Sequence, residues 1–158
     1  MSWPEGRSRR TPLSYSRVGI TPIAMTGPMR HPVSVQVFIV DDSPLVRQRL
    51  AELLIEVENV HVIGQAGTVA DALIAIPQVR PDFVMLDARM PDGDGMAVLA
   101  ALKHLEEPPL VGMLTNYPSE PYRTRCLSLG ADYFWDKSKD LAEIPAAFRE
   151  LARRPERS

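Results

Sequence analysis

Five polar side chains follow apolar runs typical of short β-strands, and their types suit phosphoryl chemistry. In chain order they are Asp41, Asp42, Asp87, Thr115 and Lys137. Because the carboxyl ends of parallel strands share one edge of a sheet, we expect these side chains to meet in one cleft. Neighbouring carboxylates ionise together only at a cost unless a cation joins them, and Mg²⁺ prefers carboxylate, water and phosphate oxygens. The pattern predicts a Mg²⁺ site with Asp87 as the nucleophile, and Thr115 and Lys137 beside the phosphoryl oxygens.

The segments that would carry these residues alternate between apolar strands and amphipathic helices. Strands are predicted at 35–40, 61–66, 83–87, 110–115 and 133–135. Most of them are uniformly apolar, as in a parallel sheet covered on both faces. Helical spacing follows each strand, at 44–58, 69–76, 96–105, 119–129 and 141–151. With right-handed crossovers the predicted fold class is α/β, a doubly wound five-stranded parallel sheet with five helices.

Capping residues and prolines predict where several helices begin and end. Ser43 and Thr68 are typical N-caps, and Gly130 is a typical C-terminal cap. Pro77 is expected to kink the second helix or end it early. Pro145 suits the first position of the last helix, so the residues before it would form a separate turn.

Composition predicts one domain with flanking tails. The chain has 158 residues, of which 45% are hydrophobic and 24% charged, enough for one core. Residues 1–32 are rich in Pro, Ser, Gly and Arg and lack periodicity. We therefore predict a disordered basic tail there, a domain at 33–154 and a short tail at 155–158. Translation from Met25 or Met29 would remove most of the first tail.

Charge, cysteine content and hydropathy argue against several classes of function. The net charge is −2, and the basic excess lies in the N-terminal tail, so the domain offers no basic face for nucleic acid. The single cysteine, Cys126, is interpreted as a small helix residue and fits a reducing compartment. No apolar run suits a membrane span or a signal peptide, which predicts a cytoplasmic protein without membrane contact. The histidines, His31, His61 and His104, share no metal-site spacing.

The motif residues resemble those of the receiver domain of two-component response regulators. The matching positions are Asp41–Asp42, Asp87 with Met90–Pro91 and Gly95, Thr115, and Phe134 three residues before Lys137. The resemblance spans residues 34–153 and is to the CheY-like, single-domain form. It implies a flavodoxin-like sheet with strand order 2-1-3-4-5.

The same resemblance implies a stand-alone member of a phosphorelay. Asp87 would accept a phosphoryl group from a sensor histidine kinase or a phosphotransfer protein. Mg²⁺ would be held by Asp42, Asp41, Asp87 and the backbone carbonyl of Arg89, and Lys137 would pair with Asp87 or its phosphate. The chain would then be a phosphoacceptor that promotes its own phosphorylation and dephosphorylation, rather than an enzyme.

The resemblance also implies a switch. Thr115 would hydrogen-bond the phosphoryl group, and Phe134 would rotate inward. This would change the face made by the fourth helix, the fifth strand and the fifth helix, which would contact an unknown protein target or a second copy of the chain. No direct contact with nucleic acid is implied.

Several positions depart from the commonest pattern of that family. Ser138 follows Lys137 where many receivers have a proline, and the switch aromatic is a Phe instead of a Tyr. Asn116 replaces a small residue and would narrow access to Asp87. Arg89 and Tyr117 stand at positions that tune dephosphorylation in the family, and their bulk predicts a slow loss of phosphate.

Two other functions remain open on the residues alone. An Asp-nucleophile, Mg²⁺-dependent phosphatase would share the carboxylate chemistry, but Asp41-Asp42-Ser43 lacks the usual Asp-x-Asp spacing and the length leaves no room for a substrate cap. A receiver-like module that binds a partner without phosphate is the other alternative. Less specific interpretations also exist: a solvated Asp41, Phe134 as plain core, Asp92 and Asp94 as turn residues, and Arg123 and Arg125 as a solvated helix face.

Overall fold

A five-stranded parallel sheet forms the centre of the computed structural model, which describes residues 34–154. Its strands are β1 (Val35–Val40), β2 (Val60–Ala66), β3 (Phe83–Asp87), β6 (Leu110–Thr115) and β7 (Tyr133–Asp136). They lie in the order β2-β1-β3-β6-β7, and each neighbouring pair is parallel. Counted along these five strands this is the order 2-1-3-4-5, so the predicted α/β doubly wound fold is confirmed. The predicted tails at 1–32 and 155–158 lie outside the described residues.

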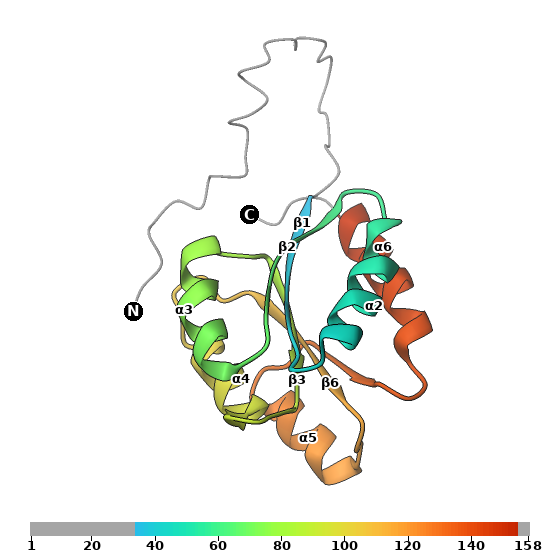
Figure 1. Ribbon diagram of the computed structural model, residues 1–158. Coiled ribbons are helices and arrows are strands. Elements are labelled where there is room, and N and C mark those ends of the chain that lie inside the picture. The colour runs from blue at the N-terminus through green and yellow to red at the C-terminus, as the bar shows by residue number, and fades with distance from the viewer. Residues whose placement is uncertain (1–33, 155–158) are drawn as a thin grey trace, which may run out of the picture.

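Within residues 34–154, five α-helices cover the two faces of the sheet, as Figure 1 shows. They are α2 (Pro44–Ile55), α3 (Val69–Val79), α4 (Gly95–Lys103), α5 (Glu120–Ser128) and α6 (Ile144–Arg153). Helices α2 and α6 pack on one face, and α3, α4 and α5 on the other. Side chains alternate along the central strands, so Phe38 of β1 joins the α3–α5 layer and Ile39 joins the α2–α6 layer. Helices are needed on both faces of the sheet because its strands carry apolar side chains on both sides.

The predicted caps are present at the helix ends. The Ser43 hydroxyl accepts the backbone N–H of Val46 at 3.2 Å, and the Thr68 hydroxyl accepts that of Asp71 at 3.0 Å. Gly130 follows α5 with φ of 110°, a conformation that favours glycine. Helix α2 ends at Ile55, three residues earlier than predicted.

The expectation that Pro77 ends the second helix early is wrong. Helix α3 continues through Pro77 to Val79 and ends at Arg80, which has left-handed backbone angles and donates its N–H to the Ile76 carbonyl at 2.8 Å. The proline removes only the bond to the carbonyl of Leu73, whose side chain is on the exposed side of the helix. Buried Ile76, one residue before the proline, keeps the last turn packed on the sheet.

The segment before Pro145 is a separate turn, as predicted. A 3₁₀ turn, η3 (Leu141–Glu143), precedes α6, and Pro145 lies in the first turn of that helix. The turn-forming run after β3 contains a small antiparallel ribbon, made of β4 (Arg89–Met90) and β5 (Gly93–Asp94). This ribbon places the residues that follow Asp87 in a defined geometry.

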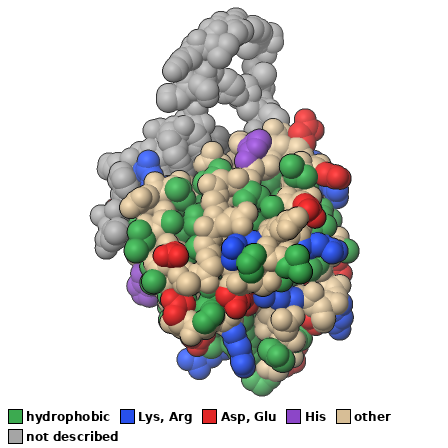
Figure 2. All heavy atoms as spheres, in the orientation of Figure 1, with side chains coloured by type: hydrophobic (Ala, Val, Ile, Leu, Met, Phe, Trp, Pro, Cys, Tyr) green, Lys and Arg blue, Asp and Glu red, His purple; other side chains and the backbone are tan. Residues whose placement is uncertain are grey.

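The surface is mixed in charge. Figure 2 shows acidic and basic side chains interspersed over the face in view. Among residues 34–154, none of the helices has the length and hydropathy to span a bilayer.

Candidate functional site

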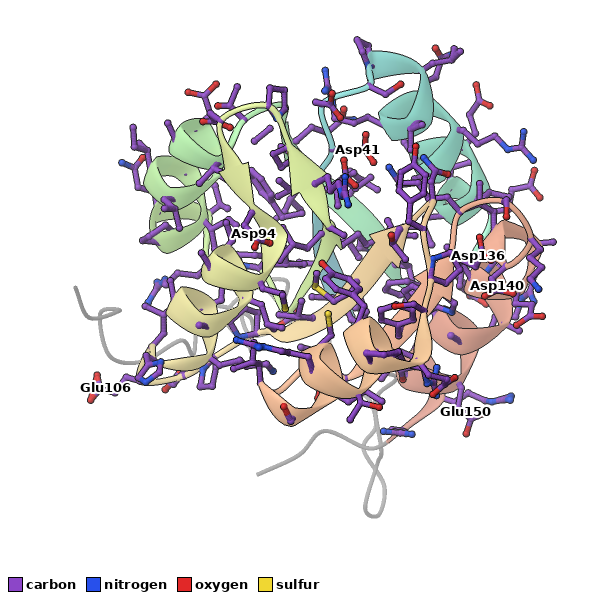
Figure 3. All side chains as sticks on the ribbon, turned by 90° about the horizontal axis from the view of Figure 1, so that it is seen from below. Asp41, Asp94, Glu106, Asp136, Asp140 and Glu150 are labelled. Carbon is purple, nitrogen blue, oxygen red and sulfur yellow. The ribbon has the colours of Figure 1, made fainter. Side chains whose placement is uncertain are left out.

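The carboxyl edge of the sheet gathers the residues that the sequence singled out. Asp41 follows β1, Asp87 ends β3 and Thr115 ends β6. Asp87 is paired in the sheet with Leu114, the residue before Thr115, and the Lys137 N–H donates to the Thr115 carbonyl at 2.8 Å. Figure 3 looks at this end of the molecule from below and labels Asp41. Residues from four strand ends therefore lie at one edge.

Lys137 joins two of the carboxylates directly. Its Nζ lies 2.6 Å from Oδ2 of Asp41 and 3.1 Å from Oδ1 of Asp87. Burial lowers the pKa of Lys137, but hydrogen bonds and charges from Asp41 and then Asp87 outweigh that effect, so the net pKa is raised. The ammonium is therefore held in its charged form between the two acids.

Asp41 is fully buried, so its interpretation as a solvated residue is wrong. Besides Lys137, its Oδ1 accepts the N–H of Ser43 at 2.9 Å. Its carbonyl accepts from Nη1 of Arg47 at 2.6 Å, and Nε of Arg47 donates to Gln65 at 3.1 Å. Arg47 thus connects the end of β1 to the end of β2. Sequence reasoning missed this role, because an arginine on an amphipathic helix is expected to face solvent.

The environment of Asp87 opposes its ionisation. The pKa of Asp87 rises from 3.8 to about 6, first because the carboxyl is buried and second because Asp41 is negatively charged. Lys137 and the N–H of Arg89, 3.4 Å from Oδ1, act in the opposite direction but do not cancel the shift. A carboxylate in this environment gains from any further positive charge beside it.

The three acids are spaced to share a cation. One carboxylate oxygen from each of Asp41, Asp42 and Asp87 lies within 4.8 Å of the others. Asp41 and Asp87 are buried, whereas Asp42 is exposed and open to solvent. Oxygen donors of this kind, with an open side for water, fit a hard divalent cation. The donor set therefore suits Mg²⁺.

Thr115 and Phe134 lie at different depths. Thr115 is buried, and its hydroxyl accepts the Tyr117 N–H at 2.9 Å. Phe134 is half-buried, with its ring 6.1 Å from that of Tyr122 and 5.8 Å from the guanidinium carbon of Arg123. Phe134 packs against the core on one side, and exposed Arg123 packs against its aromatic face.

A second cation–π contact bridges two loops at this edge. The Arg89 guanidinium carbon lies 5.2 Å from the centre of the Tyr117 ring. Arg89 follows Asp87 by two residues, and Tyr117 follows Thr115 by two. Both side chains are exposed.

Asp136 is a buried acid that the sequence reasoning did not single out. Its carboxylate accepts from the N–H of Ser138 at 2.8 Å and from the Ser138 hydroxyl at 2.6 Å. Its own N–H donates to Asp140 at 2.9 Å. These bonds shape the loop around Lys137. In the sequence, the Asp-Lys-Ser run was the feature that could have indicated this role of Asp136. Ser138, which departs from the commonest pattern, is thus part of the loop's own hydrogen bonding.

The family model for the response regulator receiver domain matches residues 37–149. This match covers most of the chain. The chain belongs to the receiver domain family.

Known relatives agree with this receiver assignment. The chain is 33% identical over 117 residues to the DNA-binding transcriptional activator DevR/DosR of Mycobacterium tuberculosis, covering 74% of this chain and 54% of the relative. The receiver thus spans about half the length of the curated relatives it matches. The signal receiver domain of the response regulator NarL from M. tuberculosis superposes with a TM-score of 0.69 at 34% identity, covering 77% of this chain and 98% of that one.

One similar solved structure is a complex that contains a metal ion. It is the CheX–CheY–BeF3–Mg²⁺ complex from Borrelia burgdorferi. Its matching chain has a TM-score of 0.67 at 26% identity, covering 75% of this receiver and 90% of that chain.

Replacing Asp87 by Asn is expected to stabilise the metal-free receiver at neutral pH. The pKa of Asp87 is raised on folding, so its charge opposes folding; this cost is absent below the unfolded pKa of 3.8 and is complete above about 6. A shift of this size sets an upper limit of about 3 kcal/mol, and we expect a gain of about 2 kcal/mol at about pH 7.5. Urea unfolding in a chelating buffer would measure it.

The pH dependence provides the check on this stabilisation. At about pH 4 the two proteins should differ little, because Asp87 is then protonated. Asp94→Asn, at an exposed position, should not show a gain in stability of this size at about pH 7.5. An Asp87→Asn gain of equal size at both pH values would contradict the prediction.

Proposed function

We propose that this receiver accepts a phosphoryl group on Asp87 from a phosphohistidine of a sensor histidine kinase or a phosphotransfer protein. The contact of Lys137 with both Asp41 and Asp87 is the observation that best supports this function. It places a cation beside the reacting carboxylate, at the strand edge where α/β sheets bind ligands. Residues 33–154 are proposed as the receiver unit.

The proposed reaction is an in-line displacement at phosphorus. A carboxylate oxygen of Asp87 forms the new O–P bond while the P–N bond to the donor imidazole breaks, and the departing nitrogen takes up a proton. Lys137 stabilises the negative charge on the phosphoryl oxygens, and the Thr115 hydroxyl donates a hydrogen bond to one of them. The receiver is consumed stoichiometrically, and its acyl phosphate is later hydrolysed.

Mg²⁺ is the proposed cofactor. Asp42, Asp41, Asp87 and the backbone carbonyl of Arg89 would hold it, and it would neutralise charge on the transferred group. The spacing of the three carboxylates supports this choice. The Mg²⁺ of the similar Borrelia complex supports it as well.

Output is proposed to pass through the face made by α5, β7 and α6. Phosphorylation would draw Thr115 toward the new phosphate and leave space for Phe134 to move inward. That movement would break the packing of Phe134 on Arg123 and change the surface that a protein target contacts. The names of the relatives place such receivers in response regulators, including a DNA-binding activator. For this receiver we propose that the target is another protein.

Labelling tests the proposed function. Purified protein incubated with radiolabelled acetyl phosphate and Mg²⁺ should acquire about one phosphoryl group per chain. A panel of histidine kinases from the source organism would then identify the donor. Catalytic turnover of a small phosphate ester would instead favour the phosphatase. Partner binding with no labelling would favour the phosphorylation-independent module.

The Arg89–Tyr117 stack is expected to slow the loss of phosphate. It joins the loops that follow Asp87 and Thr115, and so restricts the approach of water to the acyl phosphate. An exposed cation–π contact is worth about 0.5–1 kcal/mol, so Tyr117→Ala should shorten the phosphoryl half-life about two- to fivefold. The decay of labelled protein after removal of the donor measures this half-life.

Arg125→Ala is the control. It removes a different exposed arginine and should leave the phosphoryl half-life unchanged. A half-life of seconds in the unmutated protein would contradict the prediction.

A further inference from the structure

The ribbon after Asp87 is fastened to a helix that is distant in sequence. Strands β4 and β5 pair Arg89 with Asp94 and Met90 with Gly93, which leaves Pro91 and Asp92 at the tip. The base of the ribbon is closed by the Gly95 N–H, which donates to the Ala88 carbonyl at 2.9 Å. The ribbon therefore has a defined base next to Asp87 and a tip at Pro91 and Asp92.

Asp92 at the tip binds the first turn of α3. Its Oδ1 accepts the N–H of Val69 at 2.9 Å, and its Oδ2 accepts the N–H of Ala70 at 3.1 Å. These two bonds lower the pKa of Asp92, so the side chain stays ionised. The next residue, Gly93, is close to the same turn: a Cβ there would be 3.1 Å from a methyl carbon of Val69. The tip of the ribbon is thus docked on α3.

The helix does not depend on Asp92 for its ordinary cap. Thr68 is the N-cap, and its hydroxyl accepts the N–H of Asp71. The two N–H groups that Asp92 binds lie in an exposed turn, where water would otherwise satisfy them. Helix stability alone therefore gives little reason for a carboxylate to reach there from more than twenty residues away. The more direct consequence of the contact is that it holds the ribbon in place.

We propose that Asp92 is a positioning residue that fixes the ribbon, and with it the Arg89 carbonyl, against the metal-binding carboxylates. This inference rests on the proposed function, because it assigns the Arg89 carbonyl to Mg²⁺. The ribbon carries Arg89 on one strand and is tied at its base to Ala88, next to Asp87. Releasing the tip from α3 frees the segment that orients Arg89. Asp92 itself would not touch the cation.

Mg²⁺ affinity of the full chain, measured by calorimetry, tests the proposal. Residues that orient metal ligands typically contribute about tenfold or more to affinity, so Asp92→Ala should raise the Mg²⁺ dissociation constant about tenfold. Asp92→Asn keeps one acceptor oxygen and should restore part of this loss. Thr68→Ala is the matched control, because it removes a cap from the same helix without releasing the ribbon. It should lower the melting temperature and leave the dissociation constant within about twofold.

A metal-free measurement separates this proposal from the proposed function. Amide hydrogen exchange across 88–95 should be faster in Asp92→Ala than in Thr68→Ala, whether or not Mg²⁺ is present. If the unmutated chain binds Mg²⁺ and the two variants bind it equally well, Asp92 is only a helix cap and the proposal is overturned. If the unmutated chain does not bind Mg²⁺, the proposed function itself falls, and this role of Asp92 falls with it.

Discussion

Asp87→Asn is expected to abolish phosphoryl labelling completely, by acetyl phosphate and by every histidine kinase that labels the unmutated protein. An amide has nearly the shape of the carboxylate but lacks the anionic oxygen that, in the proposed reaction, would attack phosphorus. Asn can still accept hydrogen bonds from Lys137 and from the N–H of Arg89, so the loss should be one of chemistry and not of folding. Gel autoradiography after phosphotransfer measures the effect.

A nearby aspartate provides the control for this experiment. Asp94 is exposed, and it caps α4 by accepting the Met96 N–H at 2.9 Å. Asp94→Asn should keep both the cap and the labelling, because asparagine is also a good N-cap. Labelling that persists in Asp87→Asn would place the acceptor elsewhere. Asp42, the exposed member of the acidic group, would then be the next residue to replace.

Lys137→Met is expected to cause the largest loss of stability among these variants. It leaves Asp41 and Asp87 facing each other without the ammonium that now lies 2.6 and 3.1 Å from them. Removing one partner of a buried ion pair costs about 3 kcal/mol or more. In metal-free buffer at about pH 7.5, urea unfolding should show a loss of about 3 kcal/mol.

The sign of the pH dependence distinguishes an electrostatic cause of this loss of stability from a loss of side-chain packing. Without Lys137 the pKa of Asp87, already about 6, would rise further. A folded-state pKa above the unfolded value means that stability falls as pH rises through that range, so the loss should shrink toward about pH 4. Added Mg²⁺ should also reduce the loss, because a bound cation would offset the negative charge of the two acids.

Lys103→Met is the matched control for Lys137→Met. Lys103 pairs with Asp132 at 2.8 Å, but both side chains are more exposed, at 18% and 32%. Ion pairs that are open to solvent are worth about 1 kcal/mol or less, so the loss of stability in Lys103→Met should be much smaller. A Lys137→Met loss as small as this, or one equal at acid and neutral pH, would contradict the electrostatic explanation.

Hydrophobic patterning was sufficient to predict a parallel sheet and the sequence of strands and helices along the chain, whereas the strand order within the sheet was implied by the resemblance to receiver domains. Uniformly apolar strands need cover on both faces, and short right-handed connections leave few topologies. The caps at Ser43 and Thr68 could also be predicted, because a helix cap depends only on residues within one turn. Pro77 was misjudged because its effect depends on tertiary packing: buried Ile76 holds the last turn of α3 on the sheet.

By itself, the sequence determined which strand ends carry acids, a hydroxyl and an ammonium, and that a parallel sheet must bring them to one edge. It left undetermined which of them touch. Only the tertiary structure decided that Asp41 is buried, that Lys137 lies between Asp41 and Asp87, and that Asp92 binds α3. Spacing along the chain reports periodicity within one element, whereas a contact between two loops depends on how the elements that carry them are packed. For that reason the sequence predicted which residue types meet at the site, and only the fold revealed which of them are in contact.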